Sequence, residues 1–76
     1  MLNVTILSTI KIIFKGKAES VILPGDTGVF EVMSYHKRVL SRLLKGNIDV
    51  DGKVFAIVRG VAKVDRNNVM VVIEEE

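Results

Sequence analysis

Short runs of β-branched residues, each bounded by turn-forming residues, constrain the fold of this chain more than any other feature of its sequence. The 76 residues include 13 valines and 8 isoleucines, whose branched side chains pack well on a pleated sheet. The run 2–8 alternates, with Leu2, Val4 and Ile6 on one face. Similar runs recur at the spacing expected of a sandwich or barrel, so the sequence predicts an all-β fold.

Turn signals divide the chain into strands. Lys15-Gly16-Lys17 predicts a hairpin turn, and Pro24-Gly25 predicts a stop at the end of the stretch 19–23. Asp51-Gly52 is a strong hairpin signal, because both central positions of such a turn need a positive φ. A last hairpin is predicted from 61–64 and 69–73, joined through residues 65–68. Further extended stretches are predicted at 10–14, 28–33, 47–50 and 53–58.

The segment 36–45 is the exception to this extended pattern. Four apolar residues recur there at helical spacing, and four cations lie opposite them: Val39, Leu40, Leu43 and Leu44, then Lys37, Arg38, Arg42 and Lys45. Ser34 is placed to cap such a helix, and Gly46 is placed to end it. Periodicity alone therefore predicts one short amphipathic helical turn at 36–45.

A chain of this length is expected to form one domain, covering residues 1–76. It contains no cysteine, so disulfide bonds cannot compensate for the small share of surface that so short a chain buries. Its apolar runs are shorter than the ~20 residues that cross a bilayer, and its start lacks the regions of a signal peptide. We expect a soluble protein that lies beside a membrane only through a partner.

The charge pattern leaves open a second class of function, a small β-barrel that binds nucleic acid. The net charge is +2, and the densest group of cations is Lys37, Arg38, Arg42 and Lys45. Barrels that bind nucleic acid usually add stacking aromatic residues to such a basic patch, and only Tyr35 is near in the sequence. A solvated face is the simpler interpretation.

Candidates for catalysis are few, so an enzyme is the least favoured class. His36 is the only histidine, which excludes a catalytic triad or a multi-histidine metal site; a bond to loop backbone and an interface contact are its two interpretations. Asp49 and Asp51 would share a strand face, but their position beside Gly52 favours a turn role over acid–base chemistry. Residues 24–28 resemble a phosphate loop only weakly, and no cofactor is expected.

The segment Leu23-Pro24-Gly25-Asp26-Thr27-Gly28 resembles the Leu-Pro-Gly-x-x-Gly segment of the epsilon subunit of F-type ATP synthases. His36 falls at the matching histidine of that family without a gap. The resemblance continues through 39–40, 45–46, 48, 50, 55–58, 60, 64 and 68–73. No single motif is highly specific, but their order and spacing together are hard to obtain by chance, and they cover essentially the whole chain.

The sequence also departs from the family pattern. Ser34-Tyr35 and Lys37-Arg38 replace the family's Pro-Gly and Ala-Pro, and loss of the second proline is expected to make this segment more helical. Val29 stands where many members carry an acidic residue. Members usually continue into a two-helix domain that inhibits ATP hydrolysis and in some bacteria binds ATP. This sequence stops at Glu76, as a short natural form or a fragment, so neither property is expected of it.

The resemblance implies a flattened β-sandwich of about ten short strands, a non-catalytic part of the central stalk. In the family this domain lies beside the gamma subunit and on the polar loops of the c subunits of the rotor ring, where it transmits torque. The resemblance places the partner interface at seven residues: Asp26, Thr27, Val29, Glu31, His36, Lys37 and Arg38. Because Val29 is not acidic, Asp26 or Glu31 is expected to meet the arginines of the ring loops.

The resemblance also implies where such a protein acts. It would lie at the cytoplasmic face of the bacterial inner membrane, or at the equivalent organelle membrane. It would be attached there through the complex, and nucleic acid is not an expected partner.

Overall fold

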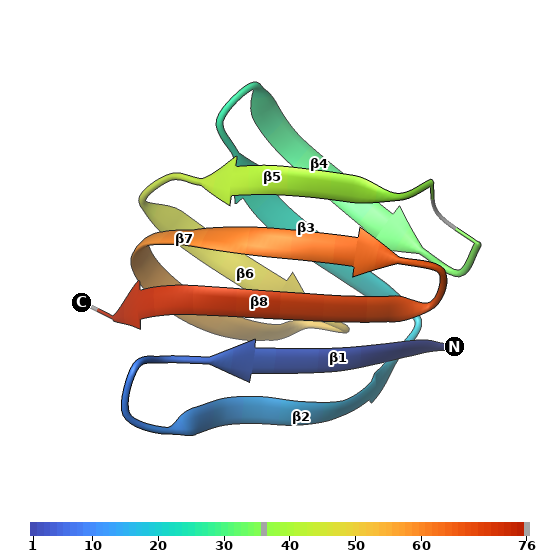
Figure 1. The fold of residues 1–76 in the computed structure, drawn as a ribbon, viewed down its shortest axis with the longest axis horizontal. Coiled ribbons are helices and arrows are strands. Elements are labelled where there is room, and N and C mark those ends of the chain that lie inside the picture. The colour runs from blue at the N-terminus through green and yellow to red at the C-terminus, as the bar shows by residue number, and fades with distance from the viewer. Residues whose placement is uncertain (36, 76) are drawn as a thin grey trace.

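The computed structural model describes residues 1–35 and 37–75, and every regular element within them is a β-strand (Figure 1). The strands are β1 (Leu2–Leu7), β2 (Ile12–Ala18), β3 (Ser20–Gly25), β4 (Gly28–Met33), β5 (Val39–Leu43), β6 (Gly46–Val50), β7 (Lys53–Asp65) and β8 (Asn68–Glu75). The all-β prediction is confirmed. The expected number of about ten strands is too high, partly because the stretches 53–58 and 61–64 belong to one strand of 13 residues, β7.

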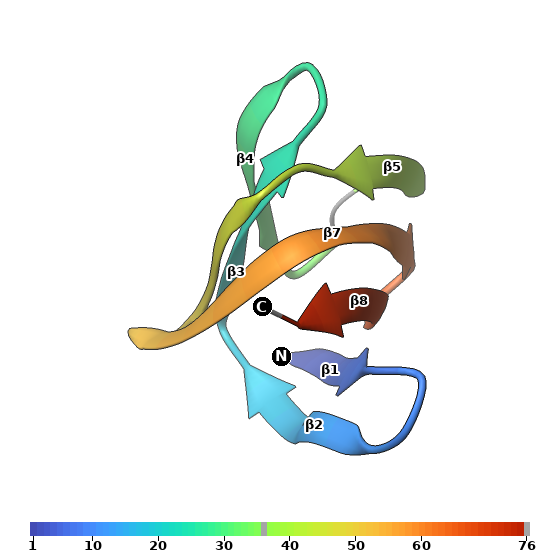
Figure 2. The same cartoon turned by 90° about the vertical axis from the view of Figure 1, so that its left-hand side faces the viewer.

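The strands form two layers that share β7. The front layer of Figure 1 contains β2, β1, β8, the second half of β7 and β5; the back layer contains β4, β3, β6 and the first half of β7. Figure 2 shows β7 curving from one layer into the other. The register shift between Ile57 and Arg59 lies at this crossing, because a bulge supplies the bend that a strand needs to change sheets. The sandwich is flattened, with extents of 30 × 26 × 20 Å.

Parallel pairing of the first and last strands completes the front layer. β1 and β8 pair from Asn3 opposite Asn68 to Leu7 opposite Val72, whereas the other strand pairs are antiparallel. Both strands are central in this layer, since β2 covers the outer side of β1 and β7 covers that of β8. The two strands are therefore held on both sides.

Alternation along the strands places an apolar core between the two layers. Among the described residues, no polar or charged side chain is buried. The front layer contributes Leu2, Val4 and Ile6 of β1 with Val69, Val71 and Ile73 of β8, and the back layer contributes Val21 and Leu23 of β3 with Ile48 and Val50 of β6. Phe14, Phe30 and Phe55 pack against this core while only partly buried. The rings of Phe14 and Phe55 meet edge to face, with centroids 5.8 Å apart.

The first hairpin turn lies earlier than the sequence pattern predicts. Lys15-Gly16-Lys17 is inside β2, where Gly16 pairs with Val4. A strand tolerates this glycine because the ring of Phe14 lies 3.3 Å from the place of its missing Cβ and fills the space. The turn is formed by residues 8–11, where the Ser8 hydroxyl oxygen accepts the amides of Ile10 and Lys11 at 3.3 and 3.2 Å.

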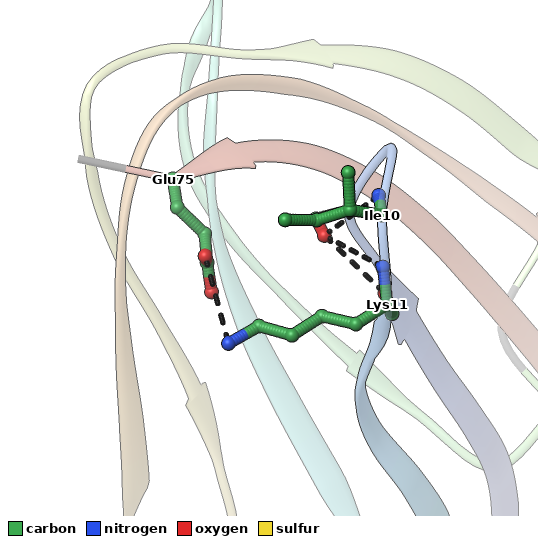
Figure 3. A network of polar contacts seen from close by, with 4 residues as sticks. Ile10, Lys11 and Glu75 are labelled. Atoms are coloured by element: carbon green, nitrogen blue, oxygen red, sulfur yellow. Dashed lines mark hydrogen bonds and ion pairs between the residues drawn. The ribbon is translucent and has the colours of Figure 1, made fainter.

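Figure 3 shows this turn and its contact with the last strand. The Lys11 side chain extends toward Glu75 of β8, with Nζ 4.0 Å from Oε2. Both side chains are substantially exposed, so this ion pair contributes little to stability. The turn is therefore held mainly by its own hydrogen bonds.

The prediction that Pro24-Gly25 stops the strand is also wrong, because both residues belong to β3. Pro24 has no N–H to pair, and its carbonyl oxygen accepts the amide of Leu44 at 2.8 Å. A Cβ at Gly25 would lie 2.8 Å from the carbonyl oxygen of Gly28, so only glycine permits this close approach. The turn follows directly, at residues 26–27.

The helical turn predicted at 36–45 is wrong. His36 lies outside the described residues, and Val39–Leu43 form β5, which pairs with residues 60–64 of β7. Leu43 is buried whereas Leu40 and Leu44 are exposed, so the apolar residues do not share one face. An isolated helix of about ten residues is marginal in water, and β7 offers the segment a complete hydrogen-bonded ladder. Tertiary pairing therefore decides its conformation, despite the lost proline.

The predicted hairpin at Asp51-Gly52 is confirmed, with positive φ values of 49° and 90°. The Asp49 Oδ1 atom accepts the amide of Gly52 at 2.7 Å. The Asp51 carboxylate reaches the corner between β2 and β3, where it accepts the amides of Glu19 and Ser20, each at 3.0 Å. The two carboxylates thus have the turn role that the sequence favours.

Replacing Asp51 by alanine is expected to lower the free energy of unfolding by about 1–2 kcal/mol. The change leaves two amides without their acceptor and places alanine at a positive φ. Asp51→Asn keeps one acceptor oxygen and a side chain that tolerates this φ, so it should retain most of the stability. Urea unfolding of the three proteins measures the difference, and an alanine variant as stable as the parent would contradict this role.

Candidate functional site

A shallow groove of about 520 Å³ lies between the β3–β4 hairpin and β5. Its lining residues are Asp26, Thr27, Gly28, Val29 and Phe30 from the hairpin and Val39, Leu40 and Ser41 from β5. Three of the predicted interface residues, Asp26, Thr27 and Val29, therefore share one wall. Val29 and Leu40 are 73% and 74% exposed. They leave apolar surface open to a partner beside the turn at Asp26 and Thr27, which is called the acidic turn.

Backbone contacts fix the two walls of the groove relative to each other. The Asp26 amide donates to the carbonyl oxygen of Arg42 at 3.1 Å, and the Leu44 amide donates to Pro24 at 2.8 Å. Gly28 has a φ of 133°, a conformation that residues with a Cβ rarely adopt. The acidic turn is thus presented by a hairpin that is tied to the neighbouring strand.

Glu31 lies farther along β4 than the groove. It pairs with Ile22 in the register of β3 and β4, and its Oε2 atom accepts the Ser20 hydroxyl at 2.5 Å. Because side chains alternate along a strand, Glu31 and Val29 point to the same outer face of the back layer. The structure therefore supplies a second carboxylate on this face, held in place by a neighbouring hydroxyl.

Lys37 and Arg38 lie between β4 and β5, beyond the end of β4 that is opposite to the acidic turn. The six residues of β4 separate the two ends by about 17 Å, at ~3.3 Å per residue. Arg38 forms an ion pair with Asp65, with Nη2 3.3 Å from Oδ1, and Lys37 is exposed. The predicted interface residues thus form two separate groups, with His36 outside the described residues.

A contact that the sequence reasoning missed holds the segment before Lys37. The side-chain oxygen of Asn67 accepts the amide of Tyr35 at 2.9 Å, and the carbonyl oxygen of Asn67 accepts the amide of Asn3 at 2.7 Å. Asn67 lies in the β7–β8 turn, so this turn anchors both β1 and Tyr35, which follows β4. Asparagine in a turn is the only sequence signal for such a role.

Leu40 and Ser41 are groove residues that the sequence reasoning also missed. The sequence pattern placed both residues in a helical turn and gave no reason to place them beside residues 26–29. The alternating exposure of 39–43, in which Leu43 is buried and Leu40 is not, is the strand signal. The helical spacing of the four apolar residues concealed it.

The cations proposed for nucleic-acid binding do not form one patch. Lys37 and Arg38 precede β5, whereas Lys45 follows it, so these residues lie at opposite ends of that strand. Arg42 points outward from β5, the last strand of the front layer, opposite Val61. Tyr35 is 90% exposed but belongs to the Lys37 end. No observation here favours nucleic-acid binding.

The shape of this surface suits binding. Within residues 1–35 and 37–75, no group of three or more His, Cys, Asp or Glu side chains is arranged to hold a metal ion. The same part of the chain contains no helix with the length and apolarity to cross a membrane. The groove is open, Asp26 and Thr27 are exposed in it, and backbone hydrogen bonds join its walls, which suits a contact with another macromolecule.

Known proteins are similar to this chain in sequence and in fold. The family model described as "ATP synthase, Delta/Epsilon chain, beta-sandwich domain" matches residues 1–75. The ATP synthase epsilon chain of Campylobacter jejuni is 34% identical over 76 residues, covering 93% of this chain and 59% of the relative. That of Sulfurimonas denitrificans is 36% identical over 78 residues, covering 96% and 60%. The chain thus spans about 60% of the length of these curated relatives.

Two solved structures have the same fold at low sequence identity. The central stalk/c-ring structure of the Tetrahymena thermophila mitochondrial ATP synthase has a chain with a TM-score of 0.80 and 15% identity, covering 97% of this chain and 63% of that one. The OSCP/F1/c-ring structure of the Euglena gracilis enzyme gives a TM-score of 0.88 and 21% identity, covering 97% and 51%. With the match of the family model to almost every residue, these findings identify the chain as a member of the ATP synthase delta/epsilon β-sandwich family.

Proposed function

We propose that residues 1–76 form one non-catalytic domain of the central stalk of an F-type ATP synthase, which couples the gamma shaft to the c subunits of the rotor ring. Membership of the delta/epsilon family and the shared fold of central-stalk chains support this role. The observation that carries the ring contact is the exposed acidic turn at Asp26, which is tied to β5 by backbone hydrogen bonds.

The ring contact depends on charge and on stiffness. Asp26 and Thr27 are exposed at the tip of the hairpin, where a carboxylate can accept the two parallel hydrogen bonds of an arginine. Glu31 adds a second carboxylate that Ser20 holds on the same hairpin. A close-packed sandwich deforms little under load, so torque applied at this end reaches the rest of the domain.

The second group of predicted interface residues is assigned to the gamma subunit. Lys37 and Arg38 lie about 17 Å from the acidic turn, too far to serve the same small contact. The ion pair with Asp65 and the Asn67 contact tie their segment to the β7–β8 turn. His36 is included by its position in the sequence. The domain would lie at the cytoplasmic face of the bacterial inner membrane, or the equivalent organelle membrane, through these partners.

The double substitution Asp26→Asn and Glu31→Gln tests the ring contact. Each exposed ion pair contributes about 0.2–1 kcal/mol, so loss of two pairs should lower the amount of ring that co-purifies by about fivefold. The assay is co-expression with the gamma and c subunits of the same organism, followed by affinity purification on this chain. Gamma should be retained, because its proposed contact is at the other end of β4.

Glu19→Gln with Glu75→Gln is the matched control, since it removes the same charge far from the acidic turn. It should leave ring recovery unchanged. Ring recovery that falls equally in both double variants would show a general charge effect and contradict the assignment of Asp26 and Glu31. Failure of the unchanged chain to recover either partner would contradict the stalk function itself.

A further inference from the structure

The outer face of the front layer combines exposed apolar side chains with cations. Cross-strand partners point to the same side of a sheet, and the register pairs Val61 with both Arg42 and Val72. In the neighbouring row, Lys63 pairs with both Leu40 and Met70. These six residues are called the basic face: Leu40, Arg42, Val61, Lys63, Met70 and Val72. Since the core takes the alternate positions of the same strands, all six point away from it.

The apolar residues of the basic face are exposed, and several of them are neighbours in the register. Leu40 is 74% exposed, and Val61, Met70 and Val72 are each 44–46% exposed. Pairing continues the two rows into β1, where Leu7 lies opposite Val72 and Thr5 opposite Met70. A patch of adjoining apolar side chains with polar groups beside it is typical of a site that binds a protein.

The unpaired charges of the basic face are positive. Within the described part of the chain, Arg42 and Lys63 form no ion pair, whereas the two acidic residues at the margins of the face do. Asp65 is bound to Arg38 at 3.3 Å, and Glu74 is bound to Arg59 at 2.9 Å. The free charge that a partner meets is therefore positive.

The basic face is not flat, because it contains two hollows. One of about 480 Å³ is lined by Arg42, Leu43, Leu44, Arg59, Gly60 and Val61. The other, of about 290 Å³, is lined by Lys63, Asp65, Asn68 and Met70. Each hollow thus has an apolar wall and an unpaired cation. A partner that fills them needs apolar side chains flanked by carboxylates.

We propose that the basic face binds an acidic amphipathic segment of a protein partner. Apolar side chains of that segment would pack on Val61, Met70 and Val72, and its carboxylates would pair with Arg42 and Lys63. The opposite outer face carries Glu31 and Asp49, which both pair with Ile22. The two faces of the sandwich therefore select partners of opposite charge. The basic face adjoins the acidic turn, because Leu40 also lines the groove and the Arg42 carbonyl oxygen accepts the Asp26 amide. The inference does not depend on the stalk function.

The basic face suits a protein better than a nucleic acid or a membrane. Nucleic-acid surfaces of small barrels present aromatic side chains for stacking, and the described residues place no aromatic side chain on this face. Membrane-binding surfaces insert a continuous band of long apolar side chains. On the basic face Lys63 lies between Leu40 and Met70 in the register, so the long apolar side chains do not form a continuous band. The side chains of a protein partner can also project into the two hollows and fill them.

A synthetic peptide with leucines on one helical face and glutamates on the other is the probe for this inference. Added to the isotope-labelled chain, it should shift the backbone amide resonances of 40–42, 61–63 and 70–72. Arg42→Glu with Lys63→Glu should weaken binding about tenfold or more, because two attractions become two repulsions. Lys53→Glu, a charge reversal at the β6–β7 hairpin away from this face, should change the affinity by less than about threefold, and Lys63→Glu alone is its matched comparison.

Three further outcomes would overturn the inference. A peptide with lysine in place of glutamate should bind more weakly, and equal binding of the two peptides would exclude a role for charge. Binding of phosphatidylserine vesicles or of an oligothymidylate at the basic face, without peptide binding, would assign it to a membrane or to nucleic acid. Shifts confined to other surfaces would show that the face is not used. The gamma subunit and the ring are absent from all of these measurements. A negative result for the basic face therefore does not affect the co-purification test of the stalk function.

Discussion

Replacing Ile57 by alanine is expected to lower the free energy of unfolding by about 2–5 kcal/mol. Ile57 is 1% exposed and lies where β7 leaves the back layer, so its residue pairs include Gly46 of β6 and Glu75 of β8. The truncation leaves a cavity in the core between the two layers. Domains of this size have little stability to spare, so a large unfolded fraction is expected even without denaturant.

Ile12→Ala is the matched control for this prediction. It removes the same atoms from a residue that is 60% exposed on the edge strand β2, where the cost should be about 0.5 kcal/mol or less. Urea unfolding followed by circular dichroism compares the two variants with the parent. Equal losses for Ile12→Ala and Ile57→Ala would show that the crossing of β7 is not a centre of stability.

Gly60→Ala is expected to destabilise the domain by about 1–3 kcal/mol, although the added group is only a methyl. A Cβ at this position would lie 2.6 Å from the carbonyl oxygen of Val72 and 3.1 Å from Cγ2 of Ile73. Two backbones approach closely here, so β7 and β8 must move apart to admit the methyl group. The thermal unfolding midpoint measures the loss.

Gly16→Ala makes the same change in a more permissive place. Its nearest contact is the side chain of Phe14, at 3.3 Å, and no backbone atom lies among its closest neighbours. The loss of chain flexibility in the unfolded state should offset a small adjustment of that ring, which leaves stability within about 1 kcal/mol of the parent. A larger loss at Gly16 than at Gly60 would contradict the close approach of β7 and β8.

Local patterns predicted the strands whose partners are adjacent in the sequence. The Asp51-Gly52 hairpin and the β7–β8 hairpin follow from turn residues and alternation. The errors at Lys15-Gly16-Lys17, at Pro24-Gly25 and in the segment 36–45 have one cause. In each case a residue's environment is set by a strand or ring that sequence periodicity does not identify, as with β7 beside Val39–Leu43.

The candidate site was predictable only in part for the same reason. The segment 23–28 indicated the acidic turn, and the structure places Asp26, Thr27 and Val29 together. The opposite wall of the groove comes from Leu40 and Ser41, whose position depends on the strand pairing that the helical interpretation missed. The basic face depends still more on pairing, because Arg42, Val61 and Val72 come from three strands.

The parallel pairing of β1 with β8 has a consequence for how the chain is made. Asn3 and Asn68 are 65 positions apart, so the ladder between these strands closes late and at a high entropic cost. While the ribosome is still adding residues 68–75, one side of β1 has no partner, and an exposed strand edge can pair with other chains. We therefore expect this domain to fold after its last strand is synthesised, and to depend until then on chaperones that shield β1.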